Sequence, residues 1–260
     1  MSELFDLSGR AALVTGSARG IGFALAEGLA KAGASVILNG TRADTVAGAV
    51  ARLGAKGFAA TGRAFDVTDE HAVAEAFAQW DKDGVHIEIL INNAGIQFRE
   101  PLVELELSDW QRVIDTNLTS AFIVSKQATK RMIARGSGGK IVNIGFADER
   151  GSTRNCGRVH RGQGWHQDAD ACDERRMGRA EWAASNIQAN AIGPGYILTD
   201  MNQALIENAA FDAWVKSSNP SQRWGKPEEL VGTAVYLSSP ASSYVNGQII
   251  YVDGGWLAVL

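Results

Sequence analysis

The stretch that most limits the possible folds is AALVTGSARGIGFALAEGLAKAGASVILNG, near the start of the chain. It opens with the apolar run Ala11 to Val14, which is typical of a buried parallel strand. A glycine-rich turn follows, then apolar residues at helical spacing that end near Gly33, an expected helix cap. The run SVILNG predicts a second strand. Strand, helix and strand in this order predict a βαβ unit with two parallel strands.

The glycines of the turn, Gly16, Gly20 and Gly22, have the spacing G-x-x-x-G-x-G. Without side chains there, the backbone can approach a pyrophosphate. The start of the following helix adds unpaired N–H groups and a positive dipole end. The turn therefore predicts a dinucleotide site. The alternative is a glycine-rich turn that binds no ligand.

Further strands are expected in GFAATGRAFDV, IEILINNAG, KIVNIG, IQANAIGPG and GQIIYVDGG. Helices are expected between them, for example over Ala72–Trp80, Ser108–Arg135 and Pro227–Leu237. This alternation predicts an α/β fold of the Rossmann type, a doubly wound parallel sheet with helices on both faces. No linker or repeat divides the chain, so we expect one domain over residues 1–260. Ligands of such folds bind at the carboxyl ends of the strands.

Several motifs follow the ends of the expected strands. TGSARGIG, NNAG, DTN, PGYILTDM and YVDGG occur in this order, and with them the chain resembles the short-chain dehydrogenase/reductase family. Within the family, VILNGTR and SSYVNGQIIYVDGG look most like the gluconate 5-dehydrogenases. The resemblance implies hydride transfer between a nicotinamide cofactor and a small-molecule substrate, a sugar acid such as gluconate or 5-ketogluconate. It also implies a homotetramer.

The resemblance and the strand ends together indicate the cofactor contacts. The expected cofactor-binding residues are Gly16, Ser17, Arg19, Gly20, Ile21, Gly22, Asn39, Thr41, Arg42, Asp66, Val67, Asn93, Ala94, Gly95, Pro194, Gly195 and Ile197. An acidic residue at the end of the second strand would bind the ribose of NAD and repel the 2′-phosphate of NADP. That strand instead ends in Asn-Gly-Thr-Arg, and Arg42 and Arg19 suit a phosphate. We expect NADP, with NAD possible and with a solvated Arg42 as the alternative.

The family uses Asn, Ser, Tyr and Lys in catalysis. Tyr is the general acid and base, Lys lowers its pKa, Ser holds the substrate oxygen, and Asn holds a water of the proton relay. Asn117 matches the Asn, but Phe146, Val159 and Gln163 stand where the family has Ser, Tyr and Lys. Phe and Val cannot transfer a proton, and neutral Gln cannot depress the pKa of a phenol. We therefore expect this chain to be inactive.

These three positions lie in an anomalous segment, residues 146–180, that has few aliphatic residues and both cysteines of the chain. Reading each codon one base further on allows Ser at 146 and Y-T-V-A-K-G-G-I-K-M-L-T-R-A-M over 159–173. That is the missing Y-x-x-x-K helix, so we interpret the segment as a frameshift product. Its glycines and charges offer no apolar stripe for a helix. We expect poor order there, lower stability and a weakened tetramer.

Other interpretations stay open. One alternative is a catalytically silent nucleotide-binding protein, and another is an inactive scaffold that has acquired the segment as a binding element. Cys156, His160, His166 and Cys172 also offer two thiolates and two imidazoles to a metal. Their spacings are looser than those of zinc fingers, and we expect no metal.

Charge and hydropathy exclude other classes of function. The net charge of −4 argues against nucleic-acid binding. No apolar run approaches membrane-spanning length, and MSELFDLSGR is not a signal peptide. Two cysteines do not make a disulfide framework. We expect a cytoplasmic protein without nucleic-acid or membrane partners.

Overall fold

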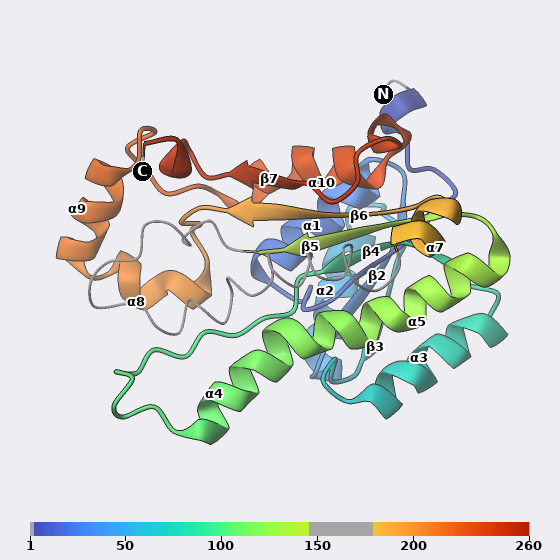
Figure 1. Ribbon diagram of the computed structural model, residues 1–260, viewed down its shortest axis with the longest axis horizontal. Coiled ribbons are helices and arrows are strands. Elements are labelled where there is room, and N and C mark those ends of the chain that lie inside the picture. The colour runs from blue at the N-terminus through green and yellow to red at the C-terminus, as the bar shows by residue number, and fades with distance from the viewer. Residues whose placement is uncertain (1–2, 146–178, 260) are drawn as a thin grey trace.

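A computed structural model describes residues 3–145 and 179–259 of the chain, and its centre is a sheet of seven parallel strands (Figure 1). The strands lie in the order β3-β2-β1-β4-β5-β6-β7. Their bounds are β1 Ala11–Val14, β2 Ser35–Gly40, β3 Ala60–Ala64, β4 Ile87–Asn92, β5 Gly139–Ile144, β6 Ile187–Pro194 and β7 Ile249–Val252. The predicted parallel α/β sheet is confirmed.

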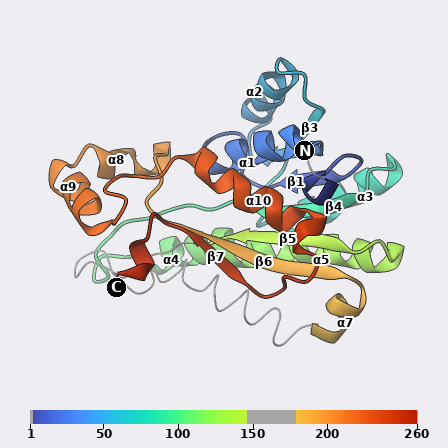
Figure 2. The ribbon, with the colours of Figure 1, turned by 90° about the horizontal axis from the view of Figure 1, so that it is seen from above.

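Helices cover both faces of this sheet, as Figure 2 shows for α1 and α10 on one side and α5 on the other. The helices are α1 Gly20–Lys31, α2 Ala43–Gly54, α3 Glu70–Lys82, α4 Leu107–Ile114, α5 Ser120–Arg135, α7 Arg179–Ala184, α8 Gln203–Ile206, α9 Ala209–Ser218 and α10 Val231–Ser238. None of those in the described ranges combines the length and apolar character of a membrane span.

Two apolar cores result from the alternation of side chains along the central strands. In β4, Ile89 and Ile91 pack with α1, α2 and α10, whereas Leu90 packs with α3 and α5. All three side chains are fully buried. Strands buried on both faces need apolar residues at successive positions, which is why ILI reads as a continuous apolar run.

The strand order reverses between β1 and β4, and this reversal places the cleft. From β1 the chain moves outward through β2 to β3, then returns to pair β4 with the other side of β1. The connections after β1 and after β4 therefore diverge to opposite faces, and they leave a crevice at the carboxyl ends of these two strands.

Glycines set the close packing of α1. Gly33 follows its last turn with a φ of +104°, as expected of a helix cap. A Cβ atom on Gly28 would lie 2.2 Å from a methyl group of Val231 in α10. The missing side chain at Gly28 thus lets α1 and α10 pack side by side on the sheet.

The predicted helix over Ser108–Arg135 exists, but it is not regular throughout. A π-helical turn, Asp115–Thr119, joins α4 to α5. A π turn widens the helix locally and often marks a functional site. It contains Asn117, whose side chain is buried. The predicted helix over Pro227–Leu237 likewise starts with a 3-10 turn, Pro227–Leu230, before α10.

One buried charge lies at the opposite end of the sheet from the cleft. The Lys140 side chain in β5 is only 5% exposed, and its ammonium group donates to the Ser242 hydroxyl at 3.1 Å. Burial, together with the positive charge of Arg10, lowers the pKa of Lys140 to about 8.

We therefore predict that the Lys140 ammonium group lowers the stability of the fold below about pH 8. Between that pH and the pKa of an unfolded lysine, about 10.4, the unfolded chain binds the extra proton. Stability relative to K140M should then rise with pH across this window. At pH 7, K140M should be more stable by on the order of 1–3 kcal/mol, measured by urea unfolding. K82M, at an exposed position, is the control, and equal pH profiles for wild type and K140M would contradict the prediction.

Candidate functional site

The turn after β1 presents its backbone to the cleft. Gly16 and Gly20 have φ values of +60° and +57°, a conformation that side chains disfavour. Gly20 begins α1, and the preceding residue, Arg19, forms no side-chain cap. The first N–H groups of α1 thus keep their capacity to bind an anion, and the positive end of the helix favours one.

A second strand end holds this turn in place. The Asn93 side chain, directly after β4, donates to the carbonyl groups of Thr15 at 2.9 Å and Gly16 at 3.1 Å. In return, the Thr15 hydroxyl accepts from the N–H groups of Asn93 at 2.9 Å and Ala94 at 3.0 Å. A Cβ atom on Gly22 would lie 2.4 Å from Asn93 Nδ2 and 2.6 Å from the Gly16 carbonyl oxygen. Glycine at 22 is therefore a packing requirement.

Ser17 has a different place from the other predicted cofactor contacts. Its side chain is fully buried beneath the turn, where the hydroxyl donates to the Val14 carbonyl at 2.7 Å and accepts from the Asn39 N–H at 3.0 Å. The buried Asn39 side chain accepts from the Gly16 N–H at 3.3 Å and donates to the Phe65 carbonyl at 3.1 Å. These two polar side chains fasten the ends of β1, β2 and β3 to one another.

The two predicted phosphate-binding cations lie at the cleft, and each is paired with a carboxylate. Arg42 makes a two-pronged contact with Asp44, with distances of 3.1 Å and 2.5 Å. These hydrogen bonds raise the pKa of Arg42 and lower the pKa of Asp44. Arg19 reaches across to Asp200, 3.3 Å away. Both pairs are exposed and therefore weak, so a phosphate can compete for either arginine.

Asp66 and Val67 follow β3 and line the same end of the cleft. The Asp66 carboxylate accepts from the N–H of Thr68 at 2.9 Å and from its hydroxyl at 2.7 Å. Val67 is 5% exposed and packs in the core shared with α3 and α5. Asp66 thus shapes a turn of its own and holds Val67 at the wall.

Asn117 lines the middle of the cleft, but its side chain is already engaged. Its Oδ1 atom accepts from the Ile96 N–H at 2.8 Å, and its Nδ2 group donates to the Ile96 carbonyl at 3.0 Å. The side chain is 1% exposed. Asn117 therefore clamps the loop that follows β4, and the π turn is the local distortion that carries it.

The loop after β6 forms the facing wall with Pro194, Gly195 and Ile197. A Cβ atom on Gly195 would lie 2.8 Å from the Asp253 Cα atom, so this glycine allows close contact with the end of β7. The Ile197 carbonyl accepts from the Asn202 side chain at 2.8 Å. This bond ties the 3-10 turn Asp200–Asn202 to the wall.

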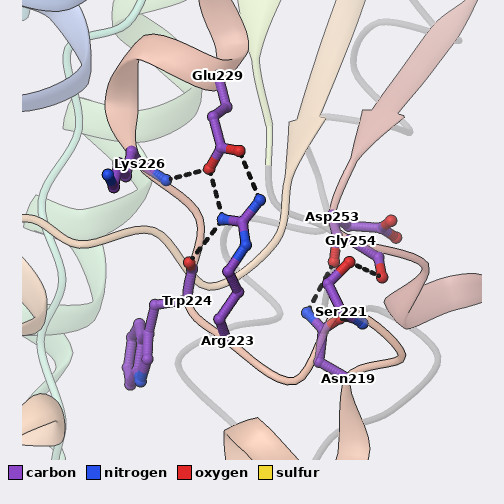
Figure 3. Close-up of polar contacts among 8 residues, drawn as sticks. All are labelled: Asn219, Ser221, Arg223, Trp224, Lys226, Glu229, Asp253 and Gly254. Atoms are coloured by element: carbon purple, nitrogen blue, oxygen red, sulfur yellow. Dashed lines mark hydrogen bonds and ion pairs between the residues drawn. The ribbon is translucent and has the colours of Figure 1, made fainter.

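The segment beyond α9 is fixed by a polar network (Figure 3). Arg223 donates to both oxygens of Glu229, at 2.8 Å and 2.6 Å. With the Lys226 N–H, these bonds lower the pKa of Glu229 to about 2. Asn219 and Ser221 donate to the carbonyls of Asp253 and Gly254, respectively. The return from α9 to α10 is thereby attached to the end of β7.

The structure brings every predicted contact except Ser17 into one cleft of about 1380 Å³. This exceeds the roughly 300–1,000 Å³ of ordinary small-molecule pockets. Asn117 lines the same cleft. The further lining residues are Ala18, Gly40, Thr45, Gly48, Ala49, Arg52, Phe65, Thr68, Ile96, Gln97, Ser108, Gln111, Arg112, Asp115, Thr116, Ile144, Gly145, Thr199, Asp200, Met201 and Asn202.

Four of the lining residues that sequence reasoning missed share a helical signal. Thr45, Gly48, Ala49 and Arg52 follow the spacing i, i+3, i+4 and i+7, which places them on one face of α2. Small and polar residues share this face. It carries no stripe of large apolar residues by which the sequence could have revealed it. Ser108, Gln111 and Arg112 lie on α4. The sequence predicted this helix but not which of its faces lines the cleft.

The three altered catalytic positions, Phe146, Val159 and Gln163, lie outside the described residues, as do Cys156, His160, His166 and Cys172. The predictions of frameshift, of poor order over 146–180 and of metal absence at that site therefore remain predictions. Residues 179 and 180 begin α7. Within 3–145 and 179–259, no group of three or more His, Cys, Asp and Glu side chains is placed to hold a metal.

Known proteins resemble this chain over nearly all of its length. Residues 16–257 match the family described as enoyl-(acyl carrier protein) reductase. The chain is 42% identical over 262 residues to 5-keto-D-gluconate 5-reductase of Escherichia coli K12, with all of both chains covered. It is 43% identical to gluconate 5-dehydrogenase of Gluconobacter oxydans, over 97% of this chain and 96% of that protein. The crystal structure of a gluconate 5-dehydrogenase from Burkholderia cenocepacia in complex with NADP and tartrate has a TM-score of 0.92, 39% identity and 99% coverage of both chains.

We predict that G22A loosens the contact between α1 and Asn93 and lowers stability. The added methyl group would clash with a side chain and two backbone atoms, and overpacking of this kind costs about 1–3 kcal/mol. G232A is the matched control, because it also lies in a helix but meets no atom within 4 Å. It should raise stability by about 0.5–1 kcal/mol. Thermal unfolding compares the two, and a G22A protein that melts at or above the wild type would refute the packing argument.

Proposed function

The chain belongs to the short-chain dehydrogenase/reductase family, whose members are NAD(P)-dependent oxidoreductases, and from this premise we propose its substrate and cofactor. The proposed reaction interconverts a hydroxyl and a ketone on a sugar acid, as between gluconate and 5-ketogluconate, with NADP. The observation that carries the proposal is the cleft between β1 and β4. It joins a glycine turn to the strand-end residues of a family whose relatives are named for these compounds.

The choice of NADP is supported by the residues after β2. The strand ends at Gly40 without a carboxylate, and Arg42 and Arg19 face the same end of the cleft. A relative with 39% identity binds NADP in its crystal structure. When bound, the cofactor would supply or accept the hydride. The turn after β1 would hold its pyrophosphate, and Asn117 would keep the loop after β4 in place.

The choice of a polar substrate is supported by the other end of the cleft. Gln97, Ser108, Gln111 and Arg112 line it, and they offer hydroxyl, amide and guanidinium groups. Arg112 is held by Asp109 at 2.8 Å. Hydroxyl and carboxylate groups of a sugar acid need such partners, because polar groups buried without hydrogen bonds are costly. A cytoplasmic location is part of the same proposal.

A second candidate is a protein that binds nucleotide without turnover. It is favoured by one observation, the residues Phe146, Val159 and Gln163 at the family's Ser, Tyr and Lys positions. The names of the relatives are those of active enzymes and do not support it. We propose that a frameshift over 146–180 accounts for these residues and that the ancestral activity is the one above.

We predict that this chain binds NADPH but has negligible activity toward 5-keto-D-gluconate. Loss of a positioned general acid and base costs about 10²–10⁴ in rate. A variant that carries F146S and the shifted reading over 159–173 should gain activity, measured by NADPH oxidation on protein of verified mass. The control is the same variant with V159F in place of V159Y, because Phe retains the ring of Tyr but lacks its hydroxyl. This control should stay inactive. Robust turnover by the chain with Val159 would overturn the prediction.

We also propose that the family's homotetramer is weakened here. On α5, Phe122 is 42% exposed and available for association, whereas Val124 is buried in the chain's own core. Residues 159–178 lack a continuous apolar stripe in their sequence. Light scattering should give a lower mean mass for this chain than for the variant with the shifted reading at equal concentration. A stable tetramer of the chain with Val159 would show this proposal to be wrong.

A further inference from the structure

Three arginine side chains line the nucleotide end of the cleft, and they differ in their charge balance. Arg42 is paired with Asp44, and Arg19 is paired with Asp200. Arg52, on α2, has no ion pair with any residue in the described ranges. Among the residues that the structure describes, Arg52 is thus the one of the three arginines without an ion pair.

Contacts with α1 and the glycine turn fix the position of the Arg52 guanidinium group. Its Cζ atom lies over the Phe23 ring, 3.8 Å from the ring centroid, and its Nη2 group donates a hydrogen bond to the Ala18 carbonyl at 2.7 Å. Stacking of this kind holds a planar guanidinium in one orientation. One of its five N–H donors is used by Ala18, and the others remain for a ligand.

The groove beside Arg52 has room for an anion. Gly48, one turn earlier on the same face of α2, lines the cleft, and a Cβ atom there would meet no atom within 4 Å. Thr45 lines the cleft one further turn back, where its hydroxyl donates to the Arg42 carbonyl at 2.9 Å. An open position and two guanidinium groups thus lie along one side of the nucleotide end.

We propose that Arg52 is a specificity-determining residue that selects the 2′-phosphate of NADP over the free 2′-hydroxyl of NAD. The inference rests on the proposed function, because it assumes that the cleft binds a nicotinamide dinucleotide. Arg52 contributes an uncompensated charge held in a fixed orientation. Its hydrogen bond to the Ala18 carbonyl also positions Ala18, the residue that precedes Arg19. NAD lacks the phosphate and gains little from this charge.

The test is a fluorescence titration of the full chain with NADPH and, separately, with NADH. R52Q should weaken NADPH binding by about 10- to 100-fold, the range for hydrogen bonds to charged groups, and NADH binding by less than about threefold. R52K should lie between wild type and R52Q, because it retains the charge but loses the planar stack. R135Q is the matched control: Arg135 also donates to a backbone carbonyl, that of Ile87 at 2.9 Å, but is not among the cleft residues. It should change neither affinity.

Each outcome distinguishes this inference from the proposed function. A wild-type chain that binds NADH as tightly as NADPH, or binds neither, would overturn the cofactor assignment. A wild type that prefers NADPH, with the same preference in R52Q, would overturn only the role of Arg52. Equal weakening of both nucleotides in R52Q would assign Arg52 a structural role through Ala18. If R52Q does not fold, R52K decides, since an unchanged ratio of affinities in R52K would overturn the inference.

Discussion

The cleft depends on the hydrogen bonds that join the end of β4 to the turn after β1. Four such bonds cross the reversal of strand order: two join Asn93 to Thr15, one joins Asn93 to the Gly16 carbonyl, and one joins the Ala94 N–H to the Thr15 hydroxyl. These bonds fix the backbone after β1 relative to the loop after β4, and the N–H groups at the start of α1 therefore lie at the same cleft as that loop. The bonds require Asn93 to lie against Gly22, so glycine and amide are one structural unit.

The other walls of the cleft are held in the same way: a buried polar side chain fixes a backbone segment beside the cleft. Asn39 fixes the ends of β2 and β3, and Asn117 fixes the Ile96 peptide. Below them, Asn92 donates to Ser125 at 2.9 Å and Asn143 at 2.8 Å, and so ties β4, β5 and α5 together. Asn39 and Asn117 use both the oxygen and the nitrogen of their amide groups, whereas Asn92 Oδ1 is buried without a hydrogen-bond partner among the described residues. Each bond that these amides make resists movement, because its loss would leave a further unpaired polar group.

The sequence allowed the sheet, the glycine turn and most of the cleft to be predicted, because strand periodicity and glycine spacing are local signals. The role of Ser17 was not predictable, since whether a hydroxyl after a strand points outward or beneath the turn depends on Asn39, more than twenty residues away. The π turn at Asn117 was missed because its apolar spacing is close to that of an ordinary helix. Arg52 was missed because its partners, Ala18 and Phe23, come from another element.

In the proposed function, nucleotide binding and proton transfer depend on different parts of this chain, and sequence identity over the whole chain reflects the two parts unequally. The glycine turn, the strand ends and the face of α2 supply the nucleotide end of the cleft, together with the loop after β6. In the proposed function, the family's Ser, Tyr and Lys would stand at 146, 159 and 163, and Asn117 would hold a water of the proton relay. Identity counted over the whole chain gives each of these three positions no more weight than any other. A chain can therefore share fold and cleft with active relatives while the identity of three side chains decides whether the bound cofactor reacts.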